Sequence, residues 1–134
     1  PIIEFACKSA HVVRLNRTNI FEANLAVALT ASGFRSERRW VFGPNPAGSA
    51  LMLYLRRPSD AGVDWEQSEE VEALQVLLGR VDVALQDVNV SYANERKISD
   101  VKPPDIVFLP HDHDVWRKDD MLTTKPRLLM STSL

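Results

Sequence analysis

The stretch that decides the fold runs from Trp65 to Val88 and reads WEQSEEVEALQVLLGRVDVALQDV. Apolar residues recur in it at alternating spacings of three and four, at Val71, Leu74, Leu78, Val81, Leu85 and Val88. This spacing places the six side chains on one face of an α-helix. The sequence therefore predicts one long helix, continuous over 68–88, whose apolar face packs on a sheet. Gly79 inside it costs about 1 kcal/mol relative to alanine and indicates a close backbone approach.

Short runs of strand-forming residues lie on both sides of this helix, at 2–7, 11–15, 39–42, 50–56 and 105–109. The run of glycine and proline over 43–48 marks a loop, so 39–42 and 50–56 are predicted to form a hairpin. Pro103 and Pro104 precede the last run, and proline favours an edge strand or a strand start.

A second helix is predicted between the first strands and the hairpin. Asn19 is expected to be its N-cap, with Glu22 in the capping-box position and Gly33 at its end. Phe21, Leu25, Ala28 and Leu29 form its apolar stripe. Shorter helical segments are expected over 91–97 and 112–122. Together these elements predict the α+β class, a small mixed or antiparallel sheet with helices packed on it.

Composition limits the possible functions. A length of 134 residues supports one domain, over 1–134, and the net charge of −2 argues against a nucleic-acid partner. No apolar run approaches the roughly 20 residues of a membrane span. Cys7 is the single cysteine, which excludes an internal disulfide and fits a reducing, cytoplasmic setting.

The last third of the chain carries a set of residues in a recognisable order. Asn89, Tyr92 and Arg96 form an Asn-x-x-Tyr-x-x-x-Arg pattern, followed by a proline-bounded strand, a tryptophan and the tail Leu122-Thr-Thr-Lys-Pro-Arg. This order resembles the C-terminal domain of the Gretchen Hagen family of acyl-acid amido synthetases, in the adenylate-forming superfamily. The resemblance implies a lid-type domain that acts on an N-terminal adenylation domain, which these 134 residues do not include.

The resemblance assigns roles to two tail residues. The family carries Gly-Gln-x-Lys-x-Pro-Arg near its C-terminus; here Lys125 and Arg127 stand for its lysine and arginine, and the glycine is missing. Lys125 is the implied catalytic residue, because a compact ammonium can neutralise the charge that builds on the α-phosphate of ATP. Arg127 is the implied substrate or nucleotide contact.

Two further roles come from the start of the chain. The segment from Pro1 to Val13 resembles the family's hinge in outline, with Lys8 at the arginine position and Ala10 where the family has Asp or Asn. Lys8 is therefore the implied hinge residue. Thr18 and Asn19 stand where the family has an acidic residue and a lysine, which makes Asn19 an implied substrate or nucleotide contact.

The resemblance implies an ATP- and Mg²⁺-dependent ligase that adenylates a carboxylic acid and joins it to an amino acid or amine. The isolated domain is expected to be inactive and to bind no cofactor. The lost hinge Asp, lysine and tail glycine favour an alternative, a free-standing binding or regulatory module. A second alternative is a tautomerase that uses the amine of Pro1 as base.

The segment His111-Asp-His-Asp114 carries metal-ligand residue types. A catalytic zinc site needs a third protein ligand, and His11 is the other histidine of the chain. We therefore interpret the segment as turn and capping chemistry and predict no metal site.

Overall fold

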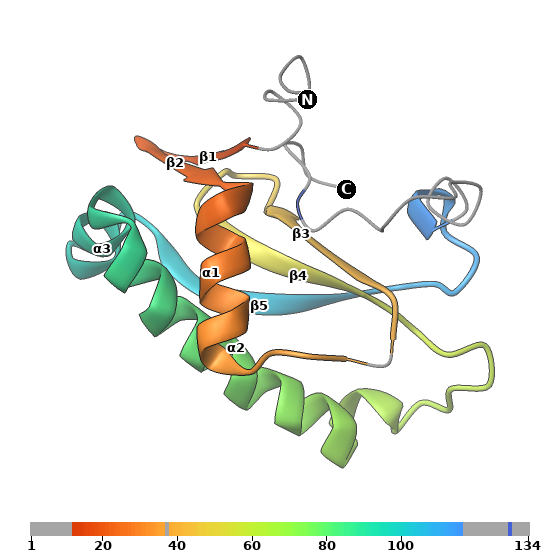
Figure 1. The fold of residues 1–134 in the computed structure, drawn as a ribbon. Coiled ribbons are helices and arrows are strands. Elements are labelled where there is room, and N and C mark those ends of the chain that lie inside the picture. The colour runs from red at the N-terminus through yellow and green to blue at the C-terminus, as the bar shows by residue number, and fades with distance from the viewer. Residues whose placement is uncertain (1–11, 37, 117–128, 130–134) are drawn as a thin grey trace, which may run out of the picture.

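The computed structural model describes residues 12–36, 38–116 and 129. Along the chain, the elements are β1 (Val12–Leu15), β2 (Thr18–Phe21), α1 (Glu22–Ser32), β3 (Trp40–Pro44), β4 (Ala50–Arg56), the 3₁₀ turn η2 (Trp65–Gln67), α2 (Glu69–Val88), α3 (Val90–Lys97) and β5 (Lys102–Leu109). Figure 1 shows the hairpin of β1 and β2 above α1, with α2 running beneath the three longer strands.

The three longer strands form one sheet in the order β3-β4-β5. β3 and β4 are antiparallel, with Phe42 opposite Leu53, which confirms the predicted hairpin. β4 and β5 are parallel, with Tyr54 opposite Val107. A parallel pair needs a long crossover, and α2 and α3 supply it. The α+β class, with a mixed sheet and helices packed on it, is confirmed.

β1 and β2 form a separate two-stranded hairpin. Val13 pairs with Ile20 and Leu15 with Thr18, so Asn16 and Arg17 make the turn. Asn16 has a φ of 53°, a left-handed conformation that asparagine tolerates better than most residues.

Two corrections concern the start of α1. Asn19 is not its N-cap, because it belongs to β2 and pairs with Arg14. The helix begins at Glu22, and the N–H of Phe21 donates to Oδ1 of Asn24 at 3.2 Å. Phe21 is half exposed and lies outside the apolar stripe, whereas Leu25, Ala28 and Leu29 are buried as predicted.

The long helix is confirmed over Glu69–Val88, with Ser68 as its N-cap. Five of the six stripe residues are buried, and the sixth, Val88, is 39% exposed near the end of the helix. Asp82 joins the buried face instead. Gly79 does not mark a close approach, because a Cβ added there would meet no described residue outside the helix's own backbone within 4 Å.

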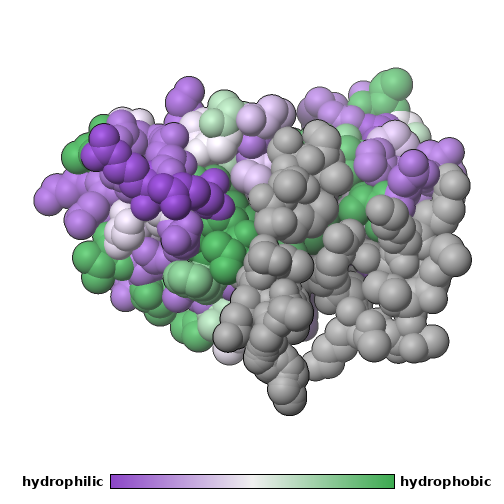
Figure 2. Space-filling view, turned by 90° about the horizontal axis from the view of Figure 1, so that it is seen from above, coloured by the Kyte–Doolittle hydropathy of each residue, from purple (hydrophilic) through white to green (hydrophobic). Residues whose placement is uncertain are grey.

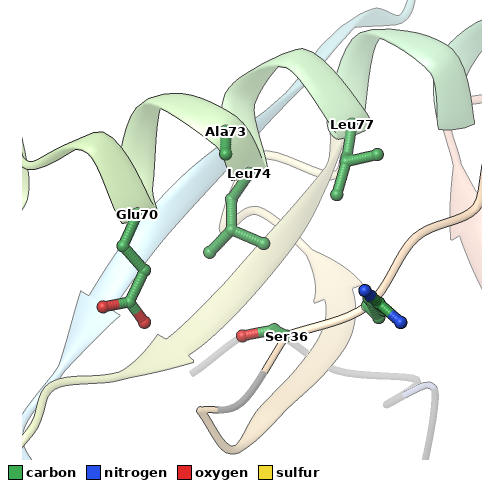
Figure 3. Close-up of a pocket in the computed structure, with 6 residues that line it drawn as sticks. Ser36, Glu70, Ala73, Leu74 and Leu77 are labelled. Atoms are coloured by element: carbon green, nitrogen blue, oxygen red, sulfur yellow. The ribbon is translucent and has the colours of Figure 1, made fainter.

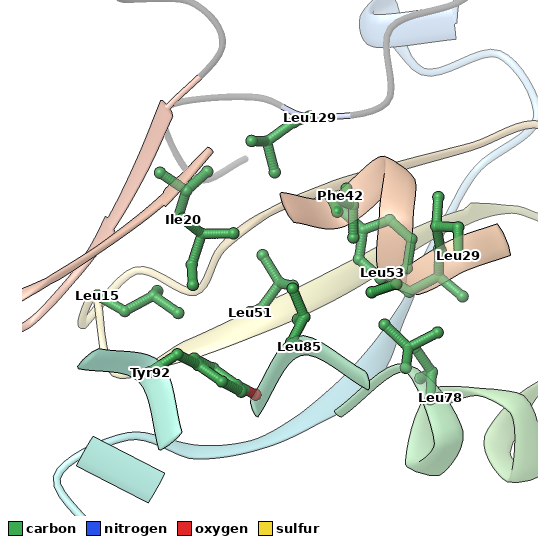
Figure 4. Close-up of a cluster of buried hydrophobic side chains, with 14 of the residues drawn as sticks. Leu15, Ile20, Leu29, Phe42, Leu51, Leu53, Leu78, Leu85, Tyr92 and Leu129 are labelled. Carbon is green, nitrogen blue, oxygen red and sulfur yellow. The ribbon is translucent and has the colours of Figure 1, made fainter. Parts of the chain in front are cut away.

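The main core lies between the sheet, the hairpin and the two long helices. Figure 4 shows Leu78 and Leu85 of α2 facing Leu51 and Leu53 of β4, with Leu15 and Ile20 of the hairpin at one end. Leu129 completes this cluster.

The other face of the sheet has a smaller core, in which Trp116 packs with Val41, Tyr54 and Val115. The indole Nε1–H of Trp116 donates to the carbonyl of Pro110 at 3.0 Å. Of the helix predicted over 112–122, residues 114–116 are helical and the remainder lies outside the described residues, as does the predicted strand 2–7. None of the helices in the described part of the chain is long and apolar enough to span a membrane.

Candidate functional site

The best-defined polar arrangement lies where the hairpin meets the junction of α2 and α3. Asn89 separates the two helices with an extended backbone and is the N-cap of α3. Its Oδ1 accepts from the N–H of Tyr92 at 2.9 Å, and its Nδ2 donates to the carbonyl of Asn19 at 2.9 Å and to Oδ1 of Asn24 at 3.2 Å. One side chain therefore joins α3 to β2 and α1.

A second contact joins the hairpin to α3. The hydroxyl groups of Thr18 and Ser91 lie 2.8 Å apart, and Thr18 is buried. The backbone of Asn19 is thus held close to the start of α3, whereas its side chain is exposed. Asn19 is the predicted contact residue that the structure describes, and its side chain is exposed.

Beneath this junction, Asp82 of α2 binds two residues of α3. Arg96 donates from Nε to Oδ1 at 2.9 Å and from Nη2 to Oδ2 at 2.8 Å, which is a bidentate pair. The hydroxyl of Tyr92 donates to Oδ1 at 2.5 Å. Asp82 is only 7% exposed, so these bonds replace most of the water that its charge would otherwise need.

The environment fixes the protonation states of this cluster. Burial raises the pKa of Asp82, but the hydrogen bonds from Arg96 and Tyr92 outweigh it, and the net pKa is lowered. Burial, together with the adjacent Asp82 carboxylate, raises the pKa of Tyr92 far above its usual range. The hydrogen bond to Asp82 also raises the pKa of Arg96. Asp82 is therefore an anion and Tyr92 a fixed donor, which suits positioning α3 rather than proton transfer.

The Asn89, Tyr92 and Arg96 pattern thus has a specific role for each residue. Asn89 caps α3, and Tyr92 and Arg96 hold it against α2 through Asp82. The sequence pattern indicated these three residues together. It missed Asp82, which looks like one polar position on a helix until its partners are known.

The tail is represented by one described residue. Leu129 is 1% exposed and forms a parallel bridge with Phe42 of β3. In Figure 4 it lies close to Ile20 and Phe42, so it is fixed near the strand that carries Asn19. The predicted residues Lys125, Arg127 and Lys8, like Pro1, lie outside the described residues.

A groove that the sequence did not indicate lies between α2 and the segment after α1. It is lined by Arg35, Ser36, Glu70, Ala73, Leu74 and Leu77 and has a volume of about 480 Å³ (Figure 3). Its floor is apolar and its rim is charged, a common combination in small-ligand sites. More than thirty residues separate its two sides in sequence, so no local motif could reveal it.

One end of this groove is defined by the Glu70 carboxylate. Nε of Arg38 donates to it at 2.8 Å, and Nε1 of Trp65 donates at 3.3 Å. The hydrogen bond from Arg38 is the main cause that lowers the pKa of Glu70. Glu70 is therefore an anion that already has two donors.

The histidine and aspartate segment shows the predicted capping chemistry. Nδ1 of His113 accepts from the N–H of Val115 at 3.1 Å, and the carbonyl of His111 accepts from Nε of Arg56 at 2.7 Å. Within the described ranges, no three His, Cys, Asp or Glu side chains are grouped to hold a metal ion.

Figure 2 shows the molecule from above. Hydrophilic residues cover much of the end that carries the hairpin and α3, and smaller groups of hydrophobic residues lie among these hydrophilic residues. Comparison of the chain with protein-family models, curated proteins and solved structures finds no match.

Proposed function

We propose that this chain is the C-terminal domain of an ATP-dependent ligase that adenylates a carboxylic acid and joins it to an amino acid or amine through an amide bond. The observation that supports the proposal is the Asn89, Tyr92 and Arg96 unit. The three residues at this spacing build one connected structure with Asp82. The resemblance of the chain to the amido synthetases includes the same three residues at the same spacing.

In this proposal, the unit holds the hairpin against α3 through the hydrogen bond from Asn89 to the carbonyl of Asn19. Asn19 lies on the hairpin, and Leu129, buried in the same core, lies four residues after Lys125 in the sequence. Lys125 neutralises the charge that builds on the α-phosphate, Arg127 contacts the nucleotide or substrate, and Lys8 is the hinge.

The proposal assigns the ATP and Mg²⁺ sites to an N-terminal adenylation domain. The C-terminal domain would contribute its lysine to adenylation and would shape the amine site for the second step. The 134-residue chain alone is expected to show no ligase activity.

The test uses the natural reading frame that encodes this chain. Release of pyrophosphate from ATP should require a carboxylic acid, and Lys125→Ala should slow this step by about 100-fold or more, since one preorganised charge donor contributes about 3–4 kcal/mol. With preformed acyl-adenylate, the same variant should form amide at nearly the wild-type rate. Lys102→Ala, at an exposed lysine of β5, is the matched control and should leave both steps unchanged.

Two outcomes would contradict the proposal. A full-length protein that releases no pyrophosphate with any carboxylic acid would exclude the ligase. A Lys125→Ala variant with both steps intact would exclude the catalytic role of the lysine.

The groove beside Glu70 favours a second candidate function, a binding or regulatory module. Its apolar floor is large enough for a small organic ligand or a partner's side chain. If the ligase test fails, ligand-induced NMR shifts confined to Ala73, Leu74 and Leu77 would support this module.

A further inference from the structure

The outward face of α2 carries a stripe of four residues, Val76, Arg80, Val83 and Asp87, in which two valines alternate with two charged residues. Val76 is 59% exposed and Val83 is 60% exposed. With 3.6 residues per turn, Val76, Arg80, Val83 and Asp87 fall within an arc of about 60°. This arc lies opposite the buried Leu78 and Leu85, so it faces away from the core.

These exposed valines are unusual on a helix surface. Valine is β-branched and has a lower helix propensity than the lysine, glutamate or alanine that normally occupy such positions. Next to the stripe, a hollow of about 440 Å³ lies between α1 and α2, and its lining includes Ala31, Gly79 and Val83. Because Gly79 has no side chain, another helix has space to approach α2 closely at this point.

The charges on the stripe have a particular arrangement. Arg80 and Asp87 lie on either side of Val83, about 10 Å apart along the helix axis. Neither side chain has a hydrogen bond or ion pair within the described part of the chain. A positive and a negative group placed evenly about an apolar centre match their own copy when one helix is reversed.

We propose that this stripe binds a second copy of the chain, with the two α2 helices antiparallel about a two-fold axis near Val83. Val83 then packs against Val83 of the second copy, and Arg80 lies opposite Asp87 of the second copy. The two-fold axis repeats this ion pair on the other side. An isologous interface must be complementary to itself, and this stripe meets that condition.

The contact is small compared with a permanent dimer. One helix face and the edge of α1 give less than the roughly 800 Å² per partner of a standard interface, so we expect a weak, concentration-dependent dimer. Its dissociation constant should be on the order of tens of micromolar and should increase with salt, because its ion pairs are partly solvated.

The test is sedimentation of the 134-residue chain from about 5 to about 500 µM, a range that spans weak association. Arg80→Asp should weaken the dimer about tenfold or more by placing like charges together, and Asp87→Arg should do the same. The double variant Arg80→Asp/Asp87→Arg restores both pairs and should dimerise nearly as well as the wild type. Such a rescue requires that the two residues face each other across copies.

Two hydrophobic variants complete the test. Val83→Glu should abolish dimerisation, whereas Val90→Glu, at a 74% exposed valine on α3, should not change it. If Val83→Glu is unfolded by circular dichroism, the charge-reversal series alone decides. Two results would overturn the proposal: a wild type that stays monomeric over the whole concentration range, or a double variant that dimerises as weakly as the single variants.

Discussion

Helix α2 carries two Arg–carboxylate clusters with nearly the same hydrogen bonds. Asp82 binds Arg96 at 2.8 and 2.9 Å and accepts a hydrogen bond from Tyr92. Twelve residues earlier, Glu70 binds Arg38 at 2.8 Å and accepts a hydrogen bond from an aromatic N–H. Each carboxylate thus has one guanidinium and one aromatic donor, and Asp82 also accepts from Nε2 of Gln86 at 3.3 Å.

The two clusters differ in burial. The side chains of Asp82 and Arg96 are 10% and 20% exposed, whereas those of Glu70 and Arg38 are 35% and 38% exposed. Water solvates the second pair in both the folded and the unfolded chain, so its formation changes the free energy little. Removing a partner from the first pair leaves a buried charge without compensation. Bond geometry alone is therefore a poor guide to the importance of either cluster.

The largest expected effect is that of Asp82→Ala. It leaves Arg96 and the Tyr92 hydroxyl without their acceptor, and we expect a loss of about 3–5 kcal/mol in the free energy of unfolding. Urea denaturation followed by circular dichroism measures this value. Glu70→Ala is the matched control on the same helix and should cost less than about 1 kcal/mol. Equal losses for the two variants would contradict the importance of burial.

Sequence reasoning identified Tyr92 and Arg96 of the first cluster but missed the carboxylate that they bind. The three-four spacing predicted α2 because helix periodicity is a local property. Asp82 interrupts the apolar face, and only its contact with Arg96, fourteen residues later, explains its burial. The spacing of Tyr92 and Arg96 marked them as a pair, but it did not identify what they bind.

The predicted start of α1 was wrong because a second interaction competes with the local pattern. Asn19 and Glu22 satisfy the local capping-box pattern. The pairing of 12–15 with 18–21 uses Asn19 as a strand residue, so hairpin pairing overrides the helix-capping preference. The parallel direction of β5 was likewise unpredictable from its own residues, because the crossover through α2 and α3 sets it.

A second prediction concerns pH. Burial raises the pKa of Asp82, but the hydrogen bonds from Arg96 and Tyr92 lower it more, so the folded value lies below the unfolded value of about 3.9. The stability from ionised Asp82 is complete above that unfolded value and is lost as the pH falls toward the folded one. The free energy of unfolding should therefore decrease from about pH 5 to about pH 3.

The slope of this decrease distinguishes the clusters. Asp82→Asn should be less stable at neutral pH and should show a clearly flatter pH dependence, since the titrating group is gone. Glu70→Gln should keep a slope close to that of the wild type, because the more exposed Glu70 contributes less. A flatter slope in Glu70→Gln than in Asp82→Asn would contradict this prediction and would assign the acid sensitivity to the Glu70 cluster.

The smallest expected effect comes from the aromatic donors. Tyr92→Phe removes one hydrogen bond to a buried carboxylate that Arg96 still holds, so we expect a loss of about 1–2 kcal/mol in the free energy of unfolding. Trp65→Phe removes the corresponding N–H from Glu70 and keeps an aromatic ring against Phe108, which Trp65 contacts edge to face. Its loss should be less than about half as large, because water replaces the donor at the exposed carboxylate. Both values come from urea denaturation at neutral pH, with unchanged circular dichroism as the check on folding. If Trp65→Phe proved the more damaging variant, packing of the 3₁₀ turn on β5, rather than donation to a carboxylate, would determine stability at this end of α2.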